Sequence, residues 1–119
     1  MIDKYIPFKS ELVNIEINNI VNEWLIWMRY EKSYSINTFE SYINDLITFF
    51  EFLNHYNNNV PTLEYLTNDV DHIVLRSWLS DLKTNKKLSA KTISRAKSSV
   101  MNFYNYLAKN YNFTKISSC

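Results

Sequence analysis

The 119-residue sequence contains no glycine, and this absence excludes several kinds of ligand site. Loops that cradle phosphates, such as the P-loop or the dinucleotide fingerprint, need glycine because the backbone must approach the ligand closely. The one cysteine, Cys119, cannot form an internal disulfide, and the only histidines, His55 and His72, lack a zinc-binding spacing. No nucleophile motif lies beside either histidine. We therefore expect no metal, no cofactor and no small-molecule substrate.

Long apolar runs are also missing. No stretch approaches the length of a membrane span, and the start Met1-Ile2-Asp3-Lys4 lacks the apolar core of a signal peptide. We expect no membrane partner and a cytoplasmic location. An apolar share of 46% at this length predicts one folded domain that needs no disulfide or metal.

Acidic side chains are absent from residues 82–119. The first 81 residues carry twelve acids and five bases, so the net charge of +1 averages a negative part and a positive part. This asymmetry favours a face that binds a polyanion, with nucleic acid as the first candidate. A solvated helix with basic turns is the alternative that charge alone leaves open. The bases of the acid-free part are Lys83, Lys86, Lys87, Lys91, Arg95, Lys97, Lys109 and Lys115.

Apolar spacing follows the helical period in four stretches, and no stretch alternates with period two. The sequence therefore predicts an all-α fold, a compact bundle of four helices. Asn57 to Asn59 and Pro61 predict a loop after the second helix. The first predicted helix covers about residues 15–31, and the second covers about 36–56 after the N-cap Ser35. The third runs from Thr67 or Asn68 to near Lys83, and the fourth begins after the cap Ser89.

Each predicted helix has an apolar stripe that we expect to face the core. Phe49 and Phe52 are surplus to the second stripe, and we expect them to pack against a neighbouring helix or to form a partner surface. The stripes are Ile17, Ile20, Val21, Trp24, Trp27 and Met28; Phe39, Tyr42, Ile43, Leu46, Phe50 and Leu53; Val70, Ile73, Val74, Trp78 and Leu82; and Ile93, Ala96, Val100, Phe103, Tyr104 and Leu107.

The outward face of the fourth helix combines charge and periodicity. Its line of basic and polar residues is spaced by four, three and four, which places them on one face. Arginine and asparagine on such a face can contact guanine and adenine in a major groove. Free N–H groups, hydroxyls and lysines at the start of the helix favour a phosphate. The line is Lys91, Arg95, Ser98 and Asn102, and the residues at the start are Lys86, Lys87, Ser89 and Thr92.

Three segments resemble a known family. Residues 35–53 are similar to the S-x-x-T-x-x-x-Y-x-x-D-L-x-x-F-x-x-F/W-L signature of the amino-terminal core-binding domain of tyrosine recombinases, the phage-integrase and Xer family. Residues 89–107 resemble the S-x-x-T-I-x-R-x-x-S-x-x-x-x-F-Y-x-Y-L pattern of the same domain. Leu66 to Val70 and Trp78-Leu79 match its third helix. The resemblance covers about residues 15–110 in the family's order and spacing.

The resemblance implies a SAM-like four-helix domain of the integrase core-binding type, which forms half of a clamp around double-stranded DNA. The second and fourth helices of that domain lie across a major groove. The catalytic Arg, Lys, His and Tyr belong to a separate carboxy-terminal domain, so this chain alone is not expected to be an enzyme. We expect an extension over residues 1–14, the domain over 15–110 and the start of a linker over 111–119. The layout favours the Xer type, which resolves chromosome dimers, with other recombinase protomers as partners in a synaptic complex.

The resemblance also implies DNA contacts residue by residue. Related Xer domains often carry arginine at the positions of Ile43 or Asn44 and of Met101 or Asn102, so direct neutralisation of phosphates is expected to be modest here. Asp45 is expected to face the bundle in an ion pair or a cap. A small helical adaptor that binds a protein and not DNA is the alternative. The expected contacts are Asn37, Thr38, Ser41 and Asn44 on the second helix, and Lys91, Thr92, Arg95, Ser98 and Asn102 on the fourth, supported by Lys86, Lys87 and Lys97.

Overall fold

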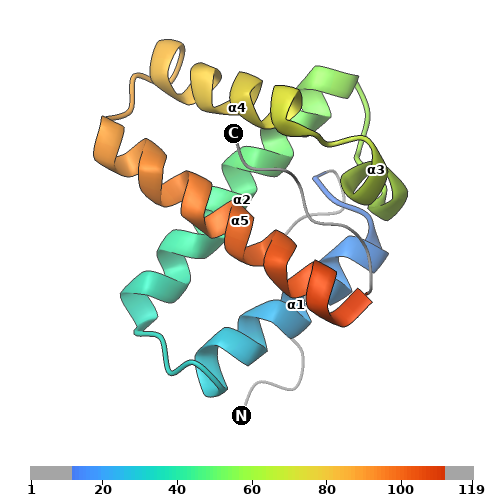
Figure 1. The fold of residues 1–119 in the computed structure, drawn as a ribbon, viewed down its shortest axis with the longest axis vertical. Helices are drawn as coiled ribbons and strands as arrows, with labels where there is room; N and C mark the ends of the chain where they lie inside the picture. Colours follow the sequence, from blue (N-terminus) through green and yellow to red (C-terminus); the bar gives the residue numbers. More distant parts are fainter. Residues whose placement is uncertain (1–11, 112–119) are drawn as a thin grey trace. The chain divides into compact units, whose positions relative to one another are not determined.

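The computed structural model describes residues 12–111, and every regular element in this part of the chain is an α-helix (Figure 1). The all-α prediction is confirmed. The chain divides into two compact units, residues 1–63 and 64–119, and each is described by itself. The helices are α1 (Ile15–Tyr30) and α2 (Ile36–Asn57) in the first unit, then α3 (Leu63–Asn68), α4 (His72–Thr84) and α5 (Ala90–Tyr111), with α3 beginning at the boundary between the units.

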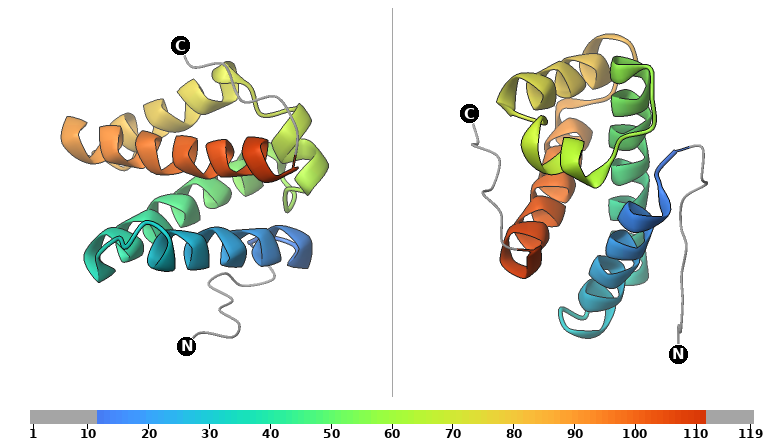
Figure 2. Two further views of the ribbon diagram at one scale, coloured as in Figure 1. Left: turned by 60° about the horizontal axis from the view of Figure 1, so that its bottom comes forward. Right: turned by 90° about the vertical axis from the view of Figure 1, so that its right-hand side faces the viewer.

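The first unit is a hairpin of α1 and α2, which pack against each other and are joined by a short turn (Figure 2). The Asn14 side chain caps α1 by accepting the Ile17 N–H at 2.9 Å, and Ser35 caps α2 as predicted. Trp24, Leu25 and Met28 are completely buried. Trp27, predicted to face the core, is only half-buried, and the Lys32 ammonium lies 5.3 Å from its ring centroid.

The two surplus phenylalanines of α2 have different environments. Phe49 is completely buried and packs 5.8 Å from the ring centroid of Phe50. Phe52 is half-buried, and its ring stacks on that of Tyr56 at a centroid distance of 5.3 Å. The prediction of internal packing is therefore confirmed for Phe49, whereas Phe52 retains partial exposure.

In the second unit the predicted third helix is wrong at its start. The chain forms the short helix α3, leaves the helical path over residues 69–71 and begins α4 at His72. Asp71 is the N-cap of α4, because its carboxylate accepts the N–H groups of Ile73 and Val74 at 3.0 Å each. Asp69 and Asp71 therefore precede the helix and do not belong to its first turn. The described residues form five helices where four were expected.

The later start of α4 also changes which residues face its core. Val70 precedes the helix but is buried as predicted, at 5% exposure. Ile73, expected to be inward, is 57% exposed, and Leu75 is buried in its place. Val74, Trp78 and Leu82 are buried as predicted.

The stripe of α5 is buried from Ala96 to Leu107, with Ile93 half-buried at its beginning. Figure 2 shows α4 turning back into α5 through a short connection, and the two helices pack against each other. Deep in this unit the Tyr104 hydroxyl donates a hydrogen bond to the Leu66 carbonyl oxygen at 2.9 Å. This bond fixes α5 to α3.

Within the described part of the chain, left-handed backbone occurs at Ser33, Asn58 and Lys87, with φ of 54°, 56° and 56°. Asn58 is the C-cap of α2, as suits an asparagine in a turn. Ser33 and Lys87 have side chains that disfavour this region, because the Cβ atom crowds the following carbonyl oxygen. In a chain without glycine these two turns carry local strain.

We predict that Ser33→Gly stabilises the protein. Glycine removes the steric cost of the left-handed backbone and gives back part of that gain as entropy, so the free energy of unfolding should rise by about 0.5–1 kcal/mol. Urea denaturation followed by circular dichroism measures this change. The matched control is Ser80→Gly, since Ser80 is exposed inside α4, where glycine should destabilise by about 0.5 kcal/mol. A destabilised Ser33→Gly variant would contradict the strain at this turn.

Candidate nucleic-acid interface

The predicted contact line of α5 lies on one exposed side of that helix. Lys91, Arg95 and Ser98 are exposed, and Asn102 is half-buried. From Lys91 to Asn102 the line covers twelve residues, or about 16 Å of helix. It lies on the opposite side of α5 from the buried stripe that includes Val100 and Phe103, so packing of the stripe presents the line to solvent.

The start of α5 is closed by a hydroxyl pair. The Ser89 hydroxyl accepts the Thr92 N–H at 3.2 Å and donates to the Thr92 hydroxyl at 3.0 Å. The Ser89 carbonyl accepts the Ile93 N–H at 3.0 Å. The Ile93 bond is the first regular bond of the helix, so the Ser89 hydroxyl takes one amide, that of Thr92, from the donors that this end offers to a phosphate. Because the Thr92 oxygen accepts the serine proton, its own O–H can donate outward.

The basic turn between α4 and α5 has a defined backbone. The N–H groups of Asn85 and Lys86 both bond to the Asp81 carbonyl, at 2.9 and 3.1 Å, and the Leu88 N–H bonds to the Leu82 carbonyl at 3.0 Å. The left-handed Lys87 lies between these bonds. Lys86 and Lys87 are both exposed, so this turn holds two ammonium groups beside the start of α5.

In the first unit, the four predicted contacts of α2 follow one another at helical spacing from the start of the helix. Asn37 and Asn44 are exposed, and Thr38 and Ser41 are half-buried. None of the four carries a charge, so this side of α2 offers amides and hydroxyls. The structure places these residues on one side of α2 and the line of Lys91 on one side of α5, each within its own unit.

The start of α2 repeats the cap of α5. The Ser35 hydroxyl accepts the Thr38 N–H at 3.2 Å and donates to the Thr38 hydroxyl at 3.1 Å. The S-x-x-T spacing shared by the two motifs is therefore a capping device, a role of Thr38 and Thr92 that the sequence analysis did not identify. The repeated spacing after two predicted helix starts was the signal available for it.

Tyr42 lies beside this side of α2, inside an aromatic cluster. Its ring stacks on Trp24 at 6.2 Å and meets Tyr34 edge-on at 5.8 Å. Burial raises the pKa of Tyr42, and nearby Tyr34 and Asp45 raise it further. The raised pKa favours the neutral phenol, which can donate a hydrogen bond, and disfavours the phenolate that a nucleophile requires.

Asp45 is only 4% exposed, so it faces the interior as predicted and not the solvent. Its backbone carbonyl accepts the Thr48 hydroxyl at 2.8 Å. The ion pair or cap expected for its carboxylate stays a prediction.

Tyr104 is a structural residue that the sequence analysis placed in the core without a role. It is completely buried, and its hydroxyl bonds to Leu66. Burial first, and then Tyr65, raise the pKa of Tyr104 well above its usual range. A buried tyrosine usually needs a partner for its hydroxyl, and that rule was the available signal.

Over residues 12–111 the structure forms no group of three or more histidine, cysteine or carboxylate side chains that could hold a metal ion. In the same range no helix is long and apolar enough to cross a membrane. The predicted contact residues carry ammonium, guanidinium, amide and hydroxyl groups.

Comparisons with known proteins agree with this picture. The profile of the phage integrase N-terminal SAM-like domain matches residues 21–110. The chain is 37% identical over 98 residues to tyrosine recombinase XerC of Rickettsia prowazekii, covering 82% of this chain and 32% of that protein. The XerC proteins of Rickettsia typhi and Rickettsia bellii are 36% and 34% identical over the same length and with the same coverage. The chain spans about a third of the length of these curated relatives. No solved structure matches it significantly.

We predict that Tyr104→Phe destabilises the second unit and changes its response to alkali. Losing the buried bond should cost about 1 kcal/mol at neutral pH, because the Leu66 carbonyl loses its donor. Above about pH 10 the unfolded tyrosine ionises while the folded one stays neutral, so the wild-type free energy of unfolding should fall as pH rises. The phenylalanine variant should lose less over the same interval. Urea denaturation at several pH values measures both effects.

The control for hydroxyl removal at neutral pH is Tyr56→Phe, since Tyr56 is half exposed and its ring stacking is kept. It should leave the free energy of unfolding nearly unchanged. Parallel alkaline curves for the wild type and Tyr104→Phe would contradict the assignment.

Proposed function

This chain belongs to the phage integrase N-terminal SAM-like domain family, and on that premise we propose that it is the DNA-binding module of a site-specific tyrosine recombinase of the Xer type. In this proposal residues 15–110 bind one half-site of a duplex through α2 and α5. The single observation that supports it most is the exposed line of Lys91, Arg95 and Ser98 on a helix that belongs to an acid-free part of the sequence.

The proposal assigns different tasks to different parts of α5. Lys86 and Lys87 in the turn, with Lys91 in the first turn of the helix, bind phosphates and supply affinity that depends on salt. Arg95 and Asn102 are further along, where long side chains reach base edges, and Arg95 is assigned to a guanine. The Thr92 hydroxyl donates to a phosphate from its capped position.

The α2 residues complete the contact surface in this proposal. Asn37 and Asn44 are amides that can bond to an adenine or to the backbone, and Thr38 and Ser41 add hydroxyl contacts. Because this side of α2 has no charge, we expect it to fix the position of the domain along the duplex and to add little salt-dependent affinity.

We assign strand cleavage to sequence outside residues 15–110. The relatives named tyrosine recombinase XerC are about three times as long as their match to this chain, and the raised pKa values of Tyr42 and Tyr104 disfavour phenolates here. Chromosome dimer resolution in the cytoplasm and contacts with other protomers in a synaptic complex follow from the Xer assignment and are part of the proposal.

We predict that Arg95→Ala weakens binding to a duplex that carries the recombination site. If Arg95 contacts a base, the loss should be roughly 1–3 kcal/mol, or about five- to 150-fold in Kd. Fluorescence anisotropy with a labelled duplex measures it. The matched control is Arg76→Ala, an exposed arginine on α4 outside the proposed face, and Glu16→Ala is a second control on α1. Equal effects of Arg95→Ala and Arg76→Ala would rule out the proposed face.

Salt dependence tests the electrostatic part separately. The slope of log K against log salt is about −0.9 for each phosphate neutralised, so Lys86→Ala together with Lys87→Ala should make the slope shallower by up to about two. The same variant should weaken specific and non-specific duplexes alike. The helical adaptor alternative predicts the opposite result, which is no duplex binding by the wild type even near 50 mM salt.

A further inference from the structure

Two hollows line the seam between α4 and α5 in the second unit. The larger has a volume of about 380 Å³ and is lined by Lys83, Leu88, Ala90, Ile93, Ser94 and Lys97. The smaller, about 120 Å³, is lined by His72, Leu75, Arg76, Leu79 and Lys97. Lys97 lines both hollows, and we call the two together the α4–α5 groove.

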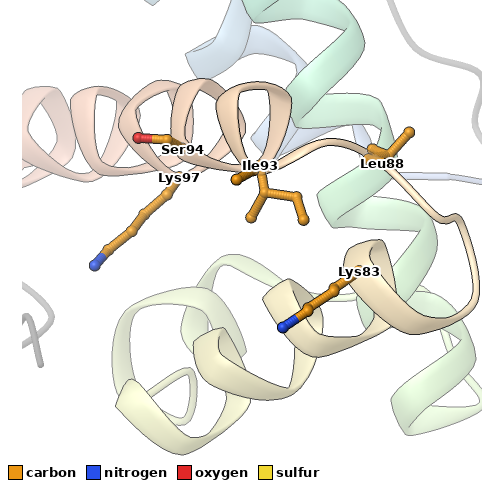
Figure 3. A pocket seen from close by; sticks show the side chains of 6 residues that line it. Lys83, Leu88, Ile93, Ser94 and Lys97 are labelled. Carbon is orange, nitrogen blue, oxygen red and sulfur yellow. The ribbon is translucent and has the colours of Figure 1, made fainter.

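The α4 side of the groove is a regular line. His72, Arg76, Leu79 and Lys83 are spaced by four, three and four, which places them on one face of the helix over about 16 Å. Figure 3 shows Ile93 and Lys97 projecting from α5 toward α4, with Lys83 across the groove. Leu88 lies at one end.

The groove combines an apolar lining with a rim of one charge. Leu79 and Ile93 are half-buried and Leu88 is 36% exposed, so apolar surface remains open to solvent. Arg76 and Lys83 are exposed on one side and Lys97 is half-buried on the other. Among residues 12–111, no acidic residue lines either hollow.

The acids nearest in the sequence do not neutralise this rim. Asp81 lies on the opposite face of α4, where its carboxylate accepts the Asn85 amide at 2.7 Å. The Asp71 carboxylate is used as the cap of α4. The rim is therefore complementary to a negatively charged ligand.

The groove is separate from the proposed DNA face on α5. At 3.6 residues per turn, Ile93 and Lys97 lie about 100° or more around the helix axis from each of Lys91, Arg95, Ser98 and Asn102. Ser94, which lines the larger hollow, lies about 40° from Ser98, so the groove borders the DNA face without sharing its predicted contact residues. A phosphate backbone would also gain nothing from leucine and isoleucine side chains, whereas a peptide with both acids and apolar residues would use the whole feature.

We infer that the α4–α5 groove is a docking site for an acidic amphipathic helix of a partner protein. Leucine-type side chains of that helix pack on Leu79, Leu88 and Ile93, and its carboxylates pair with Arg76, Lys83 and Lys97. Such a helix needs apolar residues at i, i+4 and i+7, which form one stripe, and acidic residues on both sides of that stripe. The same four-and-three spacing separates the groove residues of α4. Docking there adds a protein partner to a domain whose other face binds DNA.

The test uses the full 119-residue chain and a designed helical peptide of about four turns with leucine at i, i+4 and i+7 and glutamate on both flanks. Fluorescence anisotropy should show saturable binding, and the version with glutamine for glutamate should bind roughly tenfold more weakly. In methyl NMR spectra the signals of Leu79, Leu88 and Ile93 should shift. Ile73 is the internal control, since it is exposed on α4 but outside the groove.

Two charge-matched variants separate the surfaces. Arg76→Glu with Lys83→Glu should lose peptide affinity roughly tenfold or more and keep most duplex affinity, whereas Lys91→Glu with Arg95→Glu should do the reverse. If circular dichroism shows that either charge-reversal variant is unfolded, both variants are made again with glutamine in place of glutamate.

Three results would overturn the inference: no saturable peptide binding, equal loss of peptide binding in both variants, or displacement of the peptide by duplex DNA. The last result would make the groove part of the DNA surface. Failure of duplex binding alone would count against the proposed function and leave peptide docking measurable by itself.

Discussion

Burial of one side of α5 is the constraint on which the surfaces of the second unit depend. Ala96, Val100, Phe103 and Leu107 are almost completely removed from solvent, and the Tyr104 hydroxyl bonds to the Leu66 carbonyl at 2.9 Å. Apolar burial has no preferred direction, so it sets the side of the helix that faces inward but not its exact position. The directional bond supplies that position, because the tyrosine would otherwise leave a polar group unpaired in the core. Rotation of α5 about its axis would move every basic residue on it.

With α5 fixed, its remaining circumference is divided between two surfaces. The line from Lys91 to Asn102 faces solvent away from the core, and Ile93 with Lys97 faces the seam with α4. The acid-free part of the sequence supplies positive charge to both surfaces, but only the seam with α4 also offers apolar side chains. In the two proposals the same charge serves different ligands, because apolar surface suits a peptide and an open polar face suits a phosphate backbone.

Hydroxyl caps connect the family pattern to the fold. Ser35 with Thr38 and Ser89 with Thr92 close α2 and α5 with the same two bonds. Each pair satisfies an amide at the start of its helix and holds the threonine hydroxyl at the surface. In the proposed function Thr38 and Thr92 are both cap residues and DNA contacts, so a change at either position would affect helix stability as well as binding.

The sequence by itself determined the all-α class, the starts of α2 and α5 and most of the buried stripes, because these depend on local spacing and on caps within a few residues. It misplaced the start of α4, because Thr67 and Asn68 were expected as caps, whereas Asp71 accepts the first N–H groups of that helix. It could not identify the partner of the Tyr104 hydroxyl, 38 residues away in the chain, or the groove between α4 and α5. Those features join residues from different elements, and tertiary packing alone brings such residues together.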